Sequence, residues 1–476
     1  MTTEFTTAFE LITTLSGFFP GTTSLIVGGA VRDRLLGIEP HDVDIATNVP
    51  FDQLAAKFNL NDITKNTVNA QPVSIITFKG HSFEIAAFRT DVSGIQGKAN
   101  NVALLVDNFE EDSARRDITI NAMGIDCTNR VIDPQNGRRD LIDELVRAVG
   151  DPYMRFKEDA TRILRVFRFA AKLDFRIEER TLIAAHANKH RLINRAEISH
   201  ESIAKEIFKA ANDGPTLMRF LMMLDDATIL EDILPEFTAL RGFTHDPQWH
   251  PEWDGNVIGH IYECLRVSRS NDPVVNIAIL MHDLGKAVTR EEKDNGHSSY
   301  HGHEEAGVPI TQAIFDRLRF PDLSSEDKNT ILFAVNRHML VHNLDMLAPR
   351  TMTKLVLNPA WGVLKDVGFA DEASRHINGF DTAEFNTKIS RAEERVHRIA
   401  ANAADLRLKV KEFVDGNVLQ DWFPEIKRDL KVLKPLLAML AEFILERLDR
   451  DSPPSESEIQ SKAAAFLTEF YRADVI

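Results

Sequence analysis

The sequence LIVGGAVRDRLLGIEPHDVDIAT, residues 25–47, predicts a short strand, a tight glycine turn, one helix, a loop and a second strand. Its apolar start is typical of a buried strand. Gly28 and Gly29 let the backbone turn sharply and come close to a ligand. The helix after the glycines points its first backbone N–H groups toward that turn, where an anion such as a polyphosphate would bind well.

Two carboxylates, Asp42 and Asp44, stand one residue apart at the second strand. Residues i and i+2 of a strand point to the same side, and two like charges held together repel unless a cation lies between them. Carboxylate oxygens suit Mg²⁺, which takes water and substrate phosphates as its other ligands. A double glycine alone is typical of a turn, and an Asp-x-Asp pair alone is typical of a solvated strand end. Together, with Arg32 between them, they predict metal-assisted attack on a nucleoside triphosphate.

Length and composition describe an ordinary globular protein. The 476 residues suggest about three or four domains. Cys127 and Cys264 are the only cysteines, which fits a reducing, cytoplasmic location. The sequence predicts neither a signal peptide nor a membrane span. The net charge of −16 argues against broad affinity for RNA, so we expect a small basic contact surface such as residues 186–195.

Strand and helix patterns mix over residues 24–150, and helical periods prevail from about residue 151. We therefore predict an α+β fold, with a mixed sheet and helices first and an all-α remainder. Residues 1–20 predict an amphipathic helix, residues 74–88 a hairpin around Gly80, and Ser199 the N-cap of a later helix.

A second motif, RRDITINA at residues 115–122, places two arginines beside an aspartate and an asparagine. The fork of an arginine such as Arg116 matches phosphate oxygens, so with Asn121 this segment can clamp a triphosphate and its ribose. Alone, it would be typical of a basic strand edge.

A third motif, EDATR at residues 158–162, opens a helix predicted to run to Leu173. Asp159 and Arg162 would then be i and i+3 neighbours on one face. Asp only accepts hydrogen bonds and Arg only donates them, so the pair could read the Watson–Crick edge of C or A and reject U and G. Arg165 and Arg168 would reach the phosphates or brace Asp159. Alone, such a pair would be an ordinary surface ion pair.

With these motifs in this order, the chain resembles the class II tRNA nucleotidyltransferase family, which includes CCA-adding enzymes and bacterial poly(A) polymerases. The segment ISHESIAKE at residues 198–206 also matches. The resemblance implies that Asp42 and Asp44 bind Mg²⁺. It implies a site for the incoming CTP or ATP, for which the candidate residues are Gly28, Gly29, Arg32, Arg116, Asn121, Asp159, Arg162, Arg165 and Arg168.

Two details extend that resemblance. A third acid on a neighbouring strand is common in the wider polymerase superfamily, and Glu84 is the candidate here. The loop before the second motif usually carries arginines and acidic residues in the family and helps to change from C to A addition. Here it reads VSGIQGKANNVALLV, residues 92–106, and we expect it to be mobile. This departure leaves CC-only or A-only addition open.

Histidines gather in the later part of the chain, where nine of the 16 fall between residues 245 and 342. Neighbouring His282 and Asp283 can both reach a metal when other histidines complete its ligands. This pattern resembles an HD-type phosphohydrolase domain, whose first motifs match His260, His282 and Asp283. The resemblance implies a divalent transition metal there. His303 and His338 follow, and Asp371 is the candidate for a final aspartate.

We therefore expect a nucleotidyltransferase that adds C and A to the 3′ end of tRNA without a template, with a further HD phosphohydrolase activity. The expected domains are a catalytic head (1–150), a helical neck and body with the base-selecting helix (151–235), an HD-type domain (236–384) and a helical tail (385–476). Alternatives are a poly(A) polymerase, a metal phosphohydrolase with an RNA-binding head, and a non-catalytic tRNA-binding protein. The sequence does not predict an oligomeric state.

Overall fold

The computed structural model describes residues 3–40, 42–58, 65–66, 71–91, 103–194, 197–246, 248, 250–292, 298–376, 379–401, 410–424, 426, 430–449 and 452–473. Residues 92–102 of the predicted mobile loop lie outside these ranges, but the prediction is wrong for its described part, because Ala103–Leu105 form strand β7, which pairs with β6 (Arg89–Asp91). The chain forms two compact units, one of residues 1–243, 269–277 and 309–324 and one of residues 244–268, 278–308 and 325–476.

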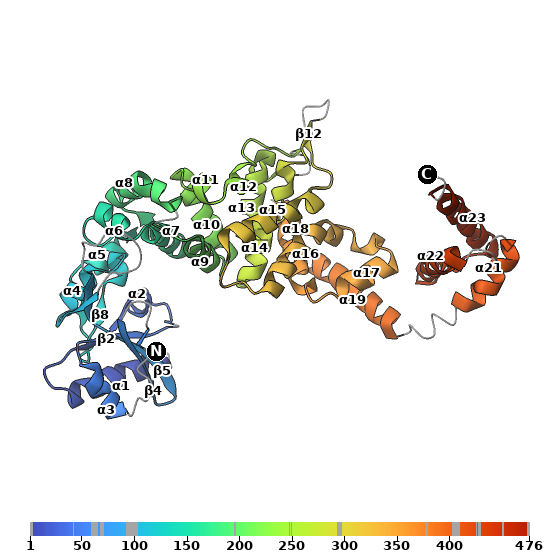
Figure 1. Ribbon diagram of the computed structural model, residues 1–476. Coiled ribbons are helices and arrows are strands. Elements are labelled where there is room, and N and C mark those ends of the chain that lie inside the picture. The colour runs from blue at the N-terminus through green and yellow to red at the C-terminus, as the bar shows by residue number, and fades with distance from the viewer. Residues whose placement is uncertain are drawn as a thin grey trace. The chain divides into compact units, whose positions relative to one another are not determined.

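The first unit contains a seven-stranded sheet, in the order β3-β4-β5-β2-β1-β8-β9. Figure 1 labels four of these strands, β2, β4, β5 and β8. Only β2 and β5 pair in parallel, so the sheet is mixed, as predicted. Its strands are β1 (Ser24–Val27), β2 (Asp44–Thr47), β3 (Lys65–Asn66), β4 (Gln71–Phe78), β5 (His81–Ala87), β8 (Gly124–Ile125) and β9 (Val131–Ile132). Smaller pairs join β6 (Arg89–Asp91) to β7 (Ala103–Leu105) and β10 (Leu145–Val146) to β11 (Arg176–Ile177).

The central strand β1 explains why residues 25–27 are continuously apolar. All four of its residues are buried, as expected for a strand covered on both faces. After it, Gly28 turns the chain at φ 75° and ψ −138°, a conformation open to glycine but not to other residues. Helix α2 (Gly29–Leu35) follows. The predicted order of strand, turn, helix, loop and strand is confirmed.

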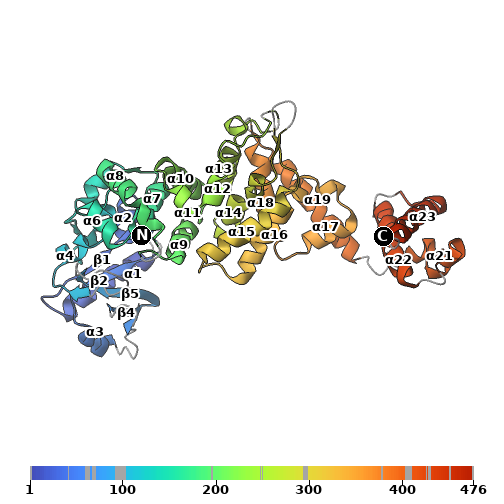
Figure 2. The ribbon, with the colours of Figure 1, turned by 45° about the horizontal axis from the view of Figure 1, so that its top comes forward.

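The other local predictions for the first unit also hold. Helix α1 (Thr3–Phe18) covers the predicted span and packs against β1 and β5 (Figures 1 and 2). The hairpin of β4 and β5 turns at Lys79 and Gly80, both with positive φ. Ser199 is the N-cap of helix α9 (His200–Ala210), where its side chain accepts from the backbone N–H of Ser202.

Helices make up most of the chain after the sheet. Those of the first unit include α3 (Phe51–Phe58), α4 (Phe109–Ala114), α5 (Gly137–Ile142), α6 (Pro152–Glu158), α7 (Thr161–Leu173), α8 (Glu179–Asn188), α10 (Gly214–Asp226), α11 (Leu230–Ile233) and α12 (Pro235–Thr238). Helix α7 packs between α9 and α10 (Figure 1). Among the described residues, no helix is both long and apolar enough to cross a membrane.

The histidine-rich region is also helical. Its helices are α13 (Val257–Val267), α14 (Pro273–Met281), α15 (His303–Leu318), α16 (Ser325–His342), α17 (Pro349–Val356), α18 (Trp361–Ser374) and α19 (Thr382–Ala401). Near the C-terminus, α21 (Gly416–Trp422), α22 (Leu430–Asp449) and α23 (Glu456–Ala473) enclose an apolar cluster of their own (Figure 2). The observed α+β architecture with a helical remainder agrees with the predicted class.

The turn at Gly28 gives a first prediction. In Gly28→Ala, the added Cβ has space, with Arg116 Nη1 at 3.6 Å, but the backbone conformation is strained by about 1–3 kcal/mol. We expect faster hydrogen–deuterium exchange of the β1 and α2 amides. Gly17→Ala is the matched control, since Gly17 lies in α1 with nothing within 4 Å of the added Cβ and should gain helix propensity. Equal exchange in both variants would contradict the prediction.

Candidate functional site

The glycine turn and the two aspartates meet at one edge of the sheet. In the antiparallel pair of β1 and β2, Val27 lies opposite Asp44, so Gly28 follows β1 where β2 begins. Asp42 and Asp44 are exposed, whereas Val43 between them is buried. This alternation puts both carboxylates on the solvent side, although Asp42 itself lies two residues before the start of β2.

A third carboxylate joins them from the neighbouring strand. The parallel register pairs Ile45 with Ile85, which sets Glu84 beside Asp44. The pKa of Asp44 is raised, first because the protein partly shields the carboxylate from water and then because of the negative charges of Glu84 and Asp42. The positive charge of Arg116 acts in the opposite direction. Such mutual repulsion is what a divalent cation would relieve, so the three acids fit a hard metal ion.

Arg116 is fixed next to this acidic edge by two anchors. Its Nε and Nη2 donate to Asp112 Oδ2 at 3.2 and 3.0 Å, and its Nη1 donates to the backbone oxygen of Asn121 at 3.3 Å. Asp112 is fully buried and also accepts from Arg115. The Arg116 side chain, 17% exposed, therefore presents a positive charge to the carboxylates in a nearly fixed position.

Arg32 is buried, and Asn121 holds it as well. Its Nη1 donates to Asn121 Oδ1 at 2.7 Å, and its Nε donates to Asp33 at 2.7 Å. The amide of Asn121 thus links the first and second motifs. Asn121 is buried, and its contacts position arginines.

The predicted start of the third helix is wrong by three residues. Helix α7 begins at Thr161, and Asp159 has an extended backbone (φ −151°, ψ 107°) at the end of α6. The side chain of Asp159 accepts from the backbone N–H of Thr161 at 2.8 Å. This local hydrogen bond favours separate helices α6 and α7 over one continuous helix. Asp159 is exposed, but it and Arg162 are not i and i+3 partners within one helix.

The arginines of α7 bind the second motif directly. Arg162 Nη2 donates to the backbone oxygen of Arg115 at 3.2 Å, and Arg165 Nε donates to Asp117 at 2.8 Å. The charge of Asp159 also acts on Arg165. The structure therefore brings the second and third motifs together.

Arg168 lies deeper and forms a buried ion pair with Glu206, 2.6 Å away, on α9. The ring of Phe169 lies below Arg168 at 4.3 Å and also meets Arg32 at 5.3 Å and Arg165 at 5.8 Å. Through this ring the first motif contacts α7 as well. Arg168 therefore links α7 to α9 through Glu206 and does not contact Asp159, the residue that it was expected to brace.

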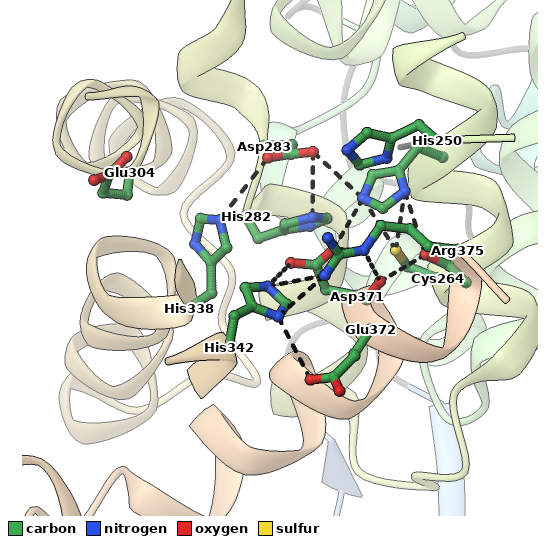
Figure 3. Close-up of polar contacts among 12 residues, drawn as sticks. His250, Cys264, His282, Asp283, Glu304, His338, His342, Asp371, Glu372 and Arg375 are labelled. Atoms are coloured by element: carbon green, nitrogen blue, oxygen red, sulfur yellow. Dashed lines mark hydrogen bonds and ion pairs between the residues drawn. The ribbon is translucent and has the colours of Figure 1, made fainter. Parts of the chain in front are cut away.

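A second polar cluster lies in the other unit and is almost wholly buried (Figure 3). His260 on α13 donates from Nδ1 to Glu252 at 2.7 Å, since a carboxylate can only accept. Its Nε2 then faces Asp371 at 3.3 Å and Asp283 at 3.6 Å. A carboxylate on one ring nitrogen that leaves the other free is the usual support of a metal-binding histidine.

Asp283 lies between two groups of histidines. Its Oδ2 is 3.3 Å from His282 Nε2, and its Oδ1 is 3.2 Å from His303 Nε2 and 3.9 Å from His338 Nε2. His282 Nε2 is buried and has no hydrogen-bond partner among the described residues. Lys286 donates to Asp283 and fixes it. Two neighbouring sets of donor atoms could each hold a cation. One set is His260, Cys264, His282 and Asp371, and the other is Asp283, His303 and His338.

Asp371, the candidate for the final aspartate, joins this centre from α18. One of its oxygens faces His260. The other accepts from His342 Nε2 at 2.7 Å (Figure 3). Arg375 lies beside it, with its Nε 3.7 Å from Asp371 Oδ1. The structure therefore gathers all the predicted residues of the HD-type site in one place.

Neighbouring basic side chains lower the pKa of the two buried aspartates. Burial alone would raise the pKa of Asp283, but His282 and Lys286 hold that pKa well below its usual range. In the same way, His342 and Arg375 outweigh burial and hold the pKa of Asp371 well below its usual range. Both carboxylates are thus charged, as metal ligands must be.

The sequence interpretation missed Glu252, Cys264 and His342 at this centre. One of them carried a signal: Cys264 follows His260 by four residues, a spacing that puts both on one face wherever the segment is helical, as it is in α13. His250 and Glu252 lie in a stretch that has no periodic pattern, so nothing local pointed to their contact with His260.

Comparisons with known proteins agree with this arrangement. The model of the Poly A polymerase head domain matches residues 24–147, and that of the HD domain matches residues 257–359. The chain is 33% identical over 344 residues to the "Multifunctional CCA protein" of Legionella pneumophila (strain Philadelphia 1), covering 70% of this chain and 78% of that protein. It is 34% identical over 336 residues to the protein of the same name from Laribacter hongkongensis, with the same coverage.

Solved structures share the fold. The CCA-adding enzyme of Bacillus stearothermophilus in complex with CTP gives a TM-score of 0.62 at 22% identity, covering 93% of each chain. The CCA-adding enzyme of Thermotoga maritima in complex with tRNA gives 0.52 at 16% identity, covering 98% of this chain and 96% of that one.

The repulsion at Asp44 gives a second prediction. Because its folded pKa is raised above the unfolded value, the ionised carboxylate destabilises the head once the pH exceeds the unfolded pKa of 3.8. In EDTA at pH 7.5, Asp44→Asn should therefore raise the melting temperature of the head. The gain should shrink as the pH falls through the raised pKa toward 3.8. A variant that melts below the wild type at pH 7.5 would show that Asp44 makes stabilising contacts instead.

Proposed function

The chain belongs to the family of multifunctional CCA proteins, and on that premise we propose that its head adds C and A to the 3′ end of tRNA from CTP and ATP. The observation that carries the proposal is the meeting of Gly28, Asp44 and Arg116 at one sheet edge. The carboxylates of Asp42 and Asp44 would hold Mg²⁺, with Glu84 beside them. Held there, Mg²⁺ would supply a Lewis acid for attack by the terminal 3′-hydroxyl on the triphosphate.

The arginines of the head would stabilise the negative charge of the triphosphate and of the leaving pyrophosphate. Attack of the RNA 3′-oxygen on the α-phosphorus forms the new phosphodiester bond and breaks the bond to pyrophosphate. Arg116, held by Asp112, would neutralise the negative charge that grows on the leaving pyrophosphate. Arg32, fixed by Asn121, would keep the triphosphate side of the turn positive. Preorganised charges of this kind need no rearrangement during the reaction.

Base choice would rest with the protein, through Asp159 and Arg162. Asp159 would accept from the exocyclic amino group that C and A share, and Arg162 would donate to the adjacent ring nitrogen. The exposure of Asp159 and the anchoring of Arg162 on the second motif support this role. It does not need the two residues to share a helix.

Incorporation of labelled CTP and ATP into tRNA that lacks its 3′ CCA tests the catalytic roles. Asp42→Ala and Asp44→Ala should each lower incorporation by roughly 10³-fold or more, because the metal loses a ligand. Asp159→Ala should keep incorporation but loosen selection of C and A over U and G. Unchanged fidelity in Asp159→Ala would remove the base-reading role. An A-only homopolymer from the wild type would favour a poly(A) polymerase.

A second activity is favoured by the buried centre around Asp283. We propose that His260, His282, Asp283 and Asp371 hold a divalent transition metal. This centre would hydrolyse phosphate esters, including 2′,3′-cyclic phosphodiesters. A metal bound there would supply an activated water. Lys286, which touches both Asp283 and His245, would keep the ligand carboxylate in place. Glu252 would fix the ring of His260.

The two proposed centres predict reciprocal losses. Asp283→Ala should abolish hydrolysis of a 2′,3′-cyclic nucleotide and lower bound transition metal, measured by mass spectrometry, while C and A incorporation continues. Asp44→Ala should lose C and A incorporation but keep both the bound transition metal and the hydrolysis of the cyclic nucleotide. Loss of both activities in Asp283→Ala, with the head still folded by circular dichroism and melting, would count against two separate centres.

A further inference from the structure

Cys264 lies inside the buried metal centre and has no role in the functions proposed above. It is fully buried on α13, one helical turn after His260. Its Sγ is 3.5 Å from His260 Nε2, the nitrogen that faces the aspartates. The thiol also lies within 4.8 Å of donor atoms of His282 and Asp371. Helical spacing and tertiary packing thus bring sulfur, nitrogen and oxygen donors to one point.

The separations match those between neighbouring ligands of one metal ion. With metal–nitrogen and metal–oxygen bonds of about 2.1 Å and metal–sulfur bonds of about 2.3 Å, neighbouring N and S ligands lie about 3.1–3.6 Å apart and neighbouring N and O ligands about 3.0–3.4 Å apart, for angles of about 90–110°. The His260 Nε2 distances are 3.5 Å to Cys264 Sγ and 3.3 Å to Asp371 Oδ1. These atoms already stand at ligand spacing.

An independent sign of a missing ligand comes from His282. His282 is 99% buried, and its Nε2 makes no hydrogen bond among the described residues, although the Asp283 carboxylate lies 3.3 Å away. A buried polar atom without a partner is costly, and a cation held with Cys264 would remove that cost. His282 Nδ1 is oriented by the backbone oxygen of Ile279 at 2.6 Å, so the free nitrogen is held toward the centre.

We propose that Cys264 is a thiolate ligand of this centre and that it gives the site a preference for thiophilic cations such as Zn²⁺ over Mg²⁺ and Mn²⁺. The inference rests on the proposed metal centre. On binding, the S–H bond breaks, the proton passes to solvent, and the sulfur electron pair forms the metal–sulfur bond. Thiolate sulfur favours zinc and similar ions, whereas carboxylates and water suit magnesium and manganese. The head, with oxygen ligands alone, and this centre would therefore take different metals.

Spectroscopy of the full-length protein tests the sulfur bond directly. The metal-free protein, prepared without oxygen, is loaded with one equivalent of Co²⁺ or Zn²⁺. In the wild type, the Co²⁺ form should show a near-ultraviolet sulfur-to-cobalt charge-transfer band. X-ray absorption of the Zn²⁺ form should show a sulfur neighbour at about 2.3 Å. Cys264→Ser should lose both signals, and its Zn²⁺ affinity should fall at least about tenfold.

Cys127→Ser is the matched control, because Cys127 is the other cysteine of the chain and belongs to the head. It should keep both signals. Cys264→Asp should still bind metal but shift the Zn²⁺ to Mn²⁺ preference toward Mn²⁺. Visible cobalt bands of a histidine-ligated site without the charge-transfer band would overturn the cysteine ligand and leave the centre standing. Failure of the wild type to bind Co²⁺ or Zn²⁺ at the histidines would overturn both.

Discussion

The antiparallel pairing of Val27 with Asp44 is the constraint on which the head depends. It sets the glycine turn at the end of β1 next to the carboxylates at the start of β2. The parallel pairing of β2 with β5 then adds Glu84 to the same edge. A shift of one residue in either register would turn Asp44 inward and Ile45 outward. The burial of Ile45 and Val43 therefore holds the acidic edge in place, and the core and the chemistry share one register.

Around that edge, buried carboxylates hold arginine side chains in place. Asp112 holds Arg115 and Arg116, Asp117 holds Arg165, and Glu206 holds Arg168. The ion pairs restrict the conformations of Arg115, Arg116 and Arg165, so little entropy would be lost if a phosphate bound them, whereas Arg168 is itself buried. In the other unit, Glu252 likewise orients His260 and Lys286 orients Asp283.

Sequence alone predicted what local rules control. The strand and glycine turn, the hairpin at Gly80 and the cap at Ser199 follow from apolar runs, backbone freedom and side-chain capping. The start of α7 was missed because Asp159 binds the backbone N–H of Thr161, and a helical period cannot reveal that choice. The contact of Glu252 with His260, and those of Asp371 with His260 and His342, depend on tertiary packing. No spacing rule encodes those contacts.

Phe169 is a point of mechanical coupling. Its ring is shared by Arg32, which follows the glycine turn, and by Arg165 and Arg168 of α7. The negative face of an aromatic ring attracts such cations, so the ring offsets repulsion among three guanidinium groups that an aliphatic side chain of equal volume would leave unopposed. A tilt of α7 would therefore move the Phe169 ring relative to the Arg32 guanidinium. The residues proposed to read the base, at the start of α7, and the arginine proposed to contact the triphosphate, Arg32, are thereby joined through one aromatic ring.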